Sequence, residues 1–165
     1  MTGLRVVVGS DEAGVDYAEQ IRADLAADPR VVEVIDIGVH RETAGFHKPY
    51  AEVGIEAGQR IVDGSADRAV LFCGTGLGVA IAANKVPGVR AVTAHDSFSV
   101  ERSILSNDCQ VLTMGERVIG LELARRLISE WLGYTFDPDS PSAPKVTALE
   151  GLEAQEISRA AGKAE

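Results

Sequence analysis

The chain has 165 residues, of which 45% are hydrophobic and 25% charged, with a formal net charge of −9 and an isoelectric point of about 4.8. This composition is typical of one globular domain, and the excess of negative charge argues against nucleic acid and anionic membranes as partners. The two cysteines form neither a disulfide framework nor a C-x-x-C metal motif. Because neither a signal peptide nor a membrane span is expected, the reducing cytoplasm is the expected compartment.

The first half of the chain alternates short apolar runs with amphipathic segments. Residues 4–9 form a continuous apolar run stopped by glycine, which predicts a strand buried on both faces, and residues 15–27 follow with helical spacing. Residues 31–37 predict a second strand, residues 40–49 a loop, and residues 50–63 a second helix.

The same alternation continues through the second half. Residues 68–73 predict a third strand, which runs into a glycine-rich segment at 74–78 and a helix to about residue 85. The remaining predicted elements are a strand at 89–94, a helix at 98–105, a strand at 110–113, a helix around 121–131, a Pro/Ser-rich loop at 137–144 and a helix at 146–161.

Five strands that alternate with helices predict an α/β fold with a parallel sheet and a helix layer on each face. We expect the flavodoxin-like (Rossmann-type) strand order 2-1-3-4-5 in a domain of residues 1–136. Residues 137–165 are expected to form a loop and a helix that pack on this domain or on a partner subunit. In such a sheet, ligands bind beyond the carboxyl ends of the strands where the strand order reverses, here between strands one and three.

Ionisable side chains gather at the carboxyl ends of the predicted strands. They are Asp11 and Glu12 after the first strand, Cys73 after the third, His95 and Asp96 after the fourth, and Glu116 and Arg117 after the fifth. Each also has an ordinary interpretation: Asp11 or Glu12 caps a helix, Arg117 pairs with Glu116 or caps a helix, and His95 is equally consistent with a role outside the site. His40 and His47 are interpreted as surface residues.

The sharpest motif is CGTGLG at residues 73–78. Its glycines allow close backbone approach and positive φ, and the N–H groups of the turn form an anion site beside Cys73. The alternative is a tight strand-to-helix turn with Cys73 as a small core residue. The motif is neither a Walker loop nor a dinucleotide fingerprint. Cys109 is interpreted as a buried structural residue.

Five segments together resemble the type-B ribose-5-phosphate isomerases and the galactose-6-phosphate isomerase subunits, from about residue 4 to residue 131. They are GSDEAG at 9–14, CGTGLGVAIAANK at 73–85, VRAV at 89–92, SND at 106–108 and GERVIGLELA at 115–124. The resemblance implies a metal-free and cofactor-free proton transfer through a cis-enediol(ate), with Cys73 as the base. It implies that Thr75 and the amides of Gly74, Gly76 and Gly78 hold the developing oxyanion.

The resemblance also assigns the substrate contacts. Asp11 falls on the residue that binds substrate hydroxyls, with Glu12 beside it, and Arg117 falls on a phosphate ligand. Asn107 falls on a residue that contacts the carbonyl end of the sugar phosphate across a dimer interface. Such enzymes are homodimers or dimers of dimers with a shared active site, and their C-terminal segment reaches over the neighbour.

The sequence departs from the type-B ribose isomerases at positions that matter for substrate. Glu12 and Ser106 stand where those enzymes carry histidine, and Pro141-Ser142 stands where they carry an Arg-His pair, which leaves Lys145 as the best second cation for the phosphate. The histidine replaced by Ser106 is the acid that opens a furanose ring. A tetrose 4-phosphate cannot close such a ring, because its 4-oxygen carries the phosphate.

Three further segments resemble the branch that interconverts D-erythrulose 4-phosphate and D-erythrose 4-phosphate: TAHDSFSVER at 93–102, LSND at 105–108 and TFDP at 135–138. In that branch His95 or Asp96 could supply the proton shuttle between the two oxygens. Three alternatives stay open: a ribose-5-phosphate or other pentose or hexose phosphate isomerase that opens rings by another group, a non-catalytic phosphosugar-binding subunit, and a flavodoxin-like nucleotide or flavin module.

Overall fold

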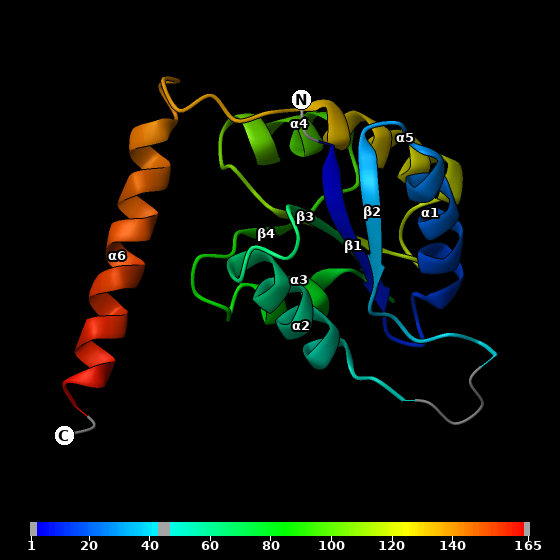
Figure 1. Cartoon of the computed structure of the whole chain (residues 1–165), viewed down its shortest axis with the longest axis horizontal. Helices are drawn as coiled ribbons and strands as arrows, with labels where there is room; N and C mark the ends of the chain where they lie inside the picture. Colours follow the sequence, from blue (N-terminus) through cyan, green and yellow to red (C-terminus); the bar gives the residue numbers. More distant parts are fainter. Residues whose placement is uncertain (1–2, 43–46, 164–165) are drawn as a thin grey trace.

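In a computed structural model that describes residues 3–42 and 47–163, a parallel five-stranded sheet lies between two layers of helices (Figure 1). The strands are β1 (Leu4–Ser10), β2 (Val31–Asp36), β3 (Arg68–Cys73), β4 (Ala91–Thr93) and β5 (Val111–Gly115). One face is covered by α1 (Val15–Ala27), α4 (Ser97–Leu105) and α5 (Leu121–Gly133), and the other by α2 (Tyr50–Val62) and α3 (Leu77–Ala83). The predicted fold class is confirmed.

The apolar runs of the central strands divide between two hydrophobic cores because successive side chains in a strand point to opposite faces. Val6, Val8 and Phe72 belong to the core under α1, α4 and α5. Val7 and Cys73 belong to the core under α2 and α3. The third strand therefore places the Cys73 thiol on the α2–α3 side of the sheet, at the carboxyl end.

The order of the last two strands differs from the prediction: the sheet runs β2-β1-β3-β5-β4, with β5 inside and β4 at the edge. An interior strand must be buried on both faces, and all five residues of β5 are buried. β4 has only three residues, of which Val92 and Thr93 are half-buried, and such a short strand suits an edge. The order places Gly115 of β5 directly opposite Cys73 of β3.

The side chain of Asn84 covers the outer edge of β4. Its Oδ1 accepts a hydrogen bond from the Ala91 N–H at 2.8 Å, and its Nδ2 donates to the Ala91 carbonyl at 2.8 Å. Asn84 is the C-cap residue of α3, so the predicted end of that helix is confirmed. One amide side chain thus satisfies both outward-facing backbone groups of the first residue of β4.

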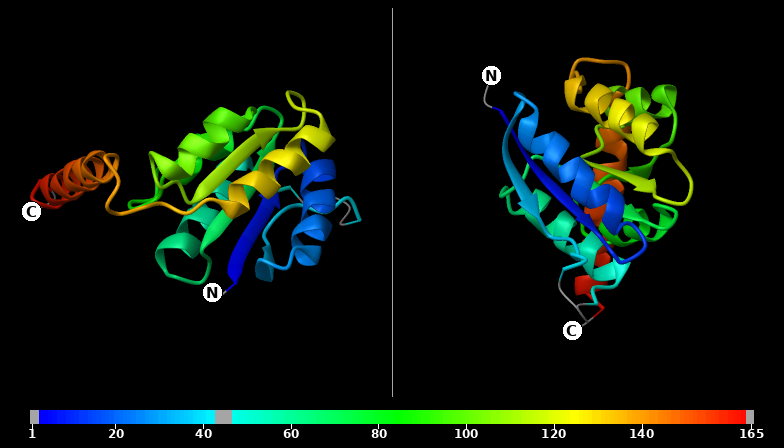
Figure 2. Two further views of the ribbon diagram at one scale, coloured as in Figure 1. Left: turned by 90° about the horizontal axis from the view of Figure 1, so that it is seen from above. Right: turned by 90° about the vertical axis from the view of Figure 1, so that its right-hand side faces the viewer.

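The last helix, α6 (Ala143–Ala161), stands apart from the sheet (Figure 2). Val146 is its one buried residue, whereas Leu149, Leu152 and Ile157 are exposed. Two polar contacts tie α6 to the body of the chain: Glu150 accepts from Arg90 at 3.1 Å, and Glu153 accepts from the Gly88 N–H at 2.7 Å. None of the helices that the structure describes is long and apolar enough to span a membrane.

Candidate active site

The turn between β3 and α3 wraps around the sulfur of Cys73. Cys73 ends β3 and is buried, and the backbone N–H of Gly76 donates a hydrogen bond to its Sγ at 3.0 Å. Gly76 has φ of +81°, and a Cβ on it would lie 2.8 Å from the carbonyl carbon of Met114. Only glycine therefore fits this position, and its amide stabilises negative charge that develops on the sulfur.

Two threonines hold the same turn from beneath. The hydroxyl oxygens of Thr113 and Thr93 lie 2.8 and 3.1 Å from the Gly76 carbonyl oxygen and 2.7 Å from each other, so one hydroxyl can donate to the carbonyl while the other donates to its neighbouring threonine. Gly115 adjoins the turn so closely that a Cβ on it would lie 2.6 Å from backbone atoms of Thr75. Sequence reasoning missed this support, although a threonine inside a buried apolar strand is a usable signal, because a buried hydroxyl needs a partner.

The segment after β5 joins the turn on its other side. The N–H of Glu116 donates to the Cys73 carbonyl at 3.0 Å, and the N–H of Arg117 donates to the Gly74 carbonyl at 3.1 Å. The exposed side chain of Arg117 extends over Gly74, where a Cβ would lie 3.4 Å from Nη1. A guanidinium thus overlies the glycine turn, where an anionic group of a ligand can meet both.

Asp11 and Glu12 follow β1 but differ in surroundings. Asp11 is half-buried, and its Oδ1 accepts from the Ala13 N–H at 2.9 Å, so it closes a turn and does not cap α1. Burial raises the pKa of Asp11 above its usual range, and the positive charge of Arg117 opposes that rise. Glu12 is exposed and contacts the imidazole of His47. Its pKa is lowered by its own backbone N–H and then by His47.

His95 lies just beyond β4, and the structure ties it to β5. Its Nε2 accepts a hydrogen bond from the Gly115 N–H at 3.0 Å, so in the neutral ring the proton resides on Nδ1. Burial lowers the pKa of His95, which favours that neutral ring. Asp96, in contrast, is the N-cap of α4, and its Oδ1 accepts from the Ser99 N–H at 2.8 Å. Of the two suggested proton shuttles, Asp96 already has a structural role.

Two predicted site residues lie away from Cys73 within one chain. Asn107 lies in the connection that leads into the amino end of β5, opposite the end that carries Cys73, and its Nδ2 donates to the Arg102 carbonyl at 3.1 Å. Lys145 is exposed in the first turn of α6. Their predicted roles in a shared site stay predictions. Cys109 is buried as predicted, and burial raises its pKa to about 12.

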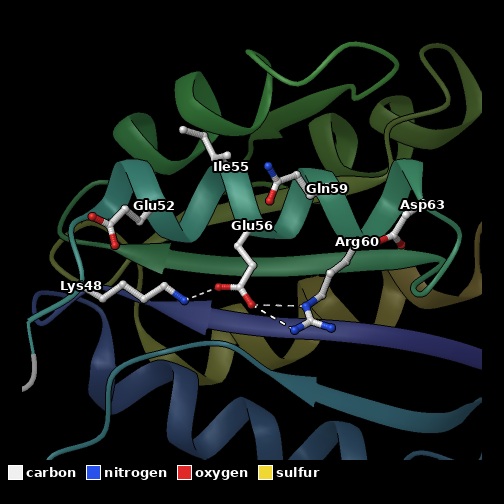
Figure 3. Close-up of a pocket in the computed structure, with 7 residues that line it drawn as sticks. All are labelled: Lys48, Glu52, Ile55, Glu56, Gln59, Arg60 and Asp63. Carbon is white, nitrogen blue, oxygen red and sulfur yellow. Dashed lines mark hydrogen bonds and ion pairs between the residues drawn. The ribbon is translucent and has the colours of Figure 1, made fainter.

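Two hollows lie elsewhere, and the basic side chains that line them are held by other groups of the chain. One, of about 600 Å³, runs along α2, where Glu56 accepts from Lys48 at 2.6 Å and from Arg60 at 3.1 Å (Figure 3). The other, of about 610 Å³, is lined by Arg30 and Arg68, whose guanidiniums are bound by Asp28 and by carbonyls at the end of α5. Among the described residues, no group of three or more His, Cys, Asp or Glu could hold a metal ion.

Fold and site together define an α/β enzyme whose cysteine, glycine turn and arginine meet at the carboxyl edge of a parallel sheet. The chain belongs to the Ribose/Galactose Isomerase family, whose model matches residues 6–149.

It is 59% identical over 146 residues to D-erythrulose-4-phosphate isomerase 2 of Mycolicibacterium smegmatis, covering 88% of this chain and 95% of the relative. It is 38% identical to D-erythrulose-4-phosphate isomerase of Pectobacterium atrosepticum, covering 93% and 97% of the two chains. The solved structure of Clostridium thermocellum ribose-5-phosphate isomerase B superposes with a TM-score of 0.83 at 35% identity, covering 93% of this chain and 99% of the other. The resemblance drawn from the sequence is thereby confirmed.

Proposed function

We propose that this protein is an aldose–ketose isomerase that interconverts D-erythrulose 4-phosphate and D-erythrose 4-phosphate, with Cys73 as the base. The observation that carries the chemistry is the hydrogen bond from the Gly76 amide to the Cys73 sulfur inside a turn overlaid by Arg117. The tetrose substrate is supported by the activity for which the Mycolicibacterium and Pectobacterium relatives are named.

The proton transfer follows from the position of the thiol. In the ketose-to-aldose direction the Cys73 thiolate removes a proton from C1 and returns it to C2, while a proton passes from O1 to O2. The intermediate cis-enediolate carries negative charge on oxygen. Thr75 is exposed, and its Oγ1 accepts from the Leu77 N–H at 3.4 Å, which leaves its hydroxyl proton to donate toward that oxygen together with the amides of the turn.

His95 is the stronger candidate for moving the proton between the two oxygens. The bond from the Gly115 N–H sets the orientation of the ring, and burial lowers its pKa and so favours the neutral form, in which Nδ1–H is the donor that remains. Asp96 is held by the backbone of α4. We therefore assign the shuttle to His95.

The remaining contacts fit a short phosphorylated chain. Arg117 is the phosphate ligand, and Asp11 binds hydroxyls, with Glu12 at the outer side of the same turn. The position that carries the ring-opening acid in type-B ribose isomerases is Ser106, at the C-cap of α4. A tetrose 4-phosphate needs no such acid, whereas a pentose 5-phosphate does.

We further propose that the active site is shared in a homodimer in the cytoplasm. The exposed apolar residues of α6 have no apolar partner within the described chain, and Tyr50, Leu77 and Ile81 are exposed over α2 and α3. Pairing of two copies buries such surfaces and gives Asn107 and Lys145 a route to the neighbour's crevice. A dimer of dimers would require a second interface in addition to this one.

The test is proton exchange followed by NMR in deuterated water, with D-erythrulose 4-phosphate and D-ribulose 5-phosphate side by side. Deuterium is expected to enter the tetrose far faster. Cys73→Ala should abolish exchange, whereas the matched variant Cys109→Ala should retain it. Faster exchange with the pentose would favour a ribose-5-phosphate isomerase, and exchange with neither would favour a phosphosugar-binding subunit.

A further inference from the structure

The segment between β5 and α5 reaches the first turn of α1 through the side chain of Glu116. Its Oε2 accepts a hydrogen bond at 3.2 Å from the backbone N–H of Tyr17, which is 99 residues away in the sequence. N–H groups in the first turn of a helix lack an acceptor within the helix and carry the positive end of its dipole. Gly14, the N-cap residue of α1, provides no side-chain cap. A carboxylate from a distant loop therefore caps this helix.

A second bond joins the same two segments. The Tyr17 hydroxyl donates to the Ile119 carbonyl at 2.8 Å, and its ring packs edge-on against Phe72 with 6.1 Å between ring centroids. Glu116 and Ile119 lie on either side of Arg117 in the chain. The segment that carries the guanidinium is therefore fastened to α1 at both of its ends.

This clasp, made of Glu116, Tyr17 and Ile119, connects the segment that carries Arg117 with the helix that follows Asp11. Asp11 leads directly into α1, because its carbonyl accepts from the Gly14 N–H at 3.2 Å. The docking of the segment after β5 on α1 therefore contributes to the separation between Asp11 and Arg117, together with the backbone bonds of that segment to Cys73 and Gly74.

We propose that Glu116 is a positioning residue that, by capping α1, fixes Arg117 relative to Asp11 so that one sugar phosphate engages both. The proposal rests on the assignment above of phosphate to Arg117 and hydroxyls to Asp11. The Glu116 carboxylate itself is turned to the α1 backbone and does not touch the substrate.

The test compares Glu116→Ala, Glu116→Gln and the matched control Glu122→Ala. Glu122 is also a carboxylate after β5, but it is exposed and pairs with Arg125. The measurements are kcat and KM with D-erythrulose 4-phosphate, the Kd of inorganic phosphate by titration calorimetry, and the Tm. Glu116→Ala is expected to raise KM and the phosphate Kd about tenfold, the scale of one charge-assisted hydrogen bond, with a smaller effect on kcat.

Glu116→Gln keeps an oxygen acceptor for the Tyr17 N–H and is expected to restore both constants close to those of the wild type. Tyr17→Phe removes only the hydroxyl bond to Ile119, so it should raise KM by a smaller factor than Glu116→Ala does. If Glu116→Ala does not fold, Tyr17→Phe replaces it as the test variant.

Two results would overturn the proposal. In one, Glu116→Ala lowers Tm but leaves KM and the phosphate Kd equal to those of Glu122→Ala, which would make the clasp purely structural. In the other, Glu116→Gln is as impaired as Glu116→Ala, which would exclude the capping bond as the cause. If the wild type binds phosphate but turns over no tetrose phosphate, the proposed activity fails while the phosphate Kd still decides the role of Glu116.

Discussion

Replacement of Gly115 by alanine tests whether the catalytic turn depends on contact with the end of β5. A Cβ at this position would lie 2.6 Å from backbone atoms of Thr75, and backbone cannot yield as a flexible side chain does. Ordinary van der Waals contact begins near 3.4 Å. The turn must therefore move by about 0.8 Å, close to the ~1 Å misplacement that costs on the order of 10²-fold in rate.

The expected outcome is a loss of kcat/KM of about 10²-fold together with a fall of about 1–3 kcal/mol in the free energy of unfolding, the usual cost of overpacking a buried site. Steady-state kinetics and urea denaturation measure the two quantities. Gly120→Ala is the matched control, because a Cβ at Gly120 meets nothing within 4 Å. If Gly115→Ala equals Gly120→Ala in kcat/KM and in the free energy of unfolding, contact with β5 does not hold the catalytic turn in place.

Three further predictions concern titratable groups. Because burial raises the pKa of Asp11, the folded protein binds a proton that the unfolded chain has released, and stability falls as pH rises from about 4 to that raised pKa. Asp11→Asn should therefore be at least as stable as the wild type in urea at pH 7, and this difference in stability should vanish near pH 4. The variant should be inactive, because it loses the carboxylate that is proposed to bind substrate hydroxyls. Lower stability of the variant at pH 7 would contradict a raised pKa of Asp11. Because burial lowers the pKa of His95, a limb of the kcat–pH profile that is lost in His95→Gln should lie below pH 6.5, and a His95-dependent limb above that value would contradict the lowered pKa. Iodoacetamide at pH 8 should inactivate the enzyme at Cys73 and leave Cys109 unmodified, because burial raises the pKa of that thiol to about 12; peptide mass spectrometry distinguishes the two.

The elements that the sequence predicts well are those with long apolar runs. β1 and β3 are buried on both faces, so their runs are continuous and the glycine turn after Cys73 marks the site. The order of β4 and β5 was not predictable in this way, since both runs are short and only their burial separates an edge from an interior position.

Some contacts between distant segments left no signal in the sequence. The capping of α1 by Glu116 spans 99 residues, and no local spacing reveals it. The role of Asp96 is different, because an aspartate directly before a helix is a recognisable cap, and the structure shows that role. The position of a residue at a strand end therefore indicated which side chains lie near the carboxyl edge of the sheet. The hydrogen-bond partner of each side chain became clear only from the structure.

The amide of Asn84 at the outer edge of β4 has a consequence for how this protein assembles. A free strand edge is a template on which another chain can continue the sheet. Here the outward N–H and C=O of Ala91 are both occupied by Asn84, which acts as a one-residue substitute for a sixth strand. Asn84 therefore opposes continuation of the sheet from one copy into the next at the start of this edge.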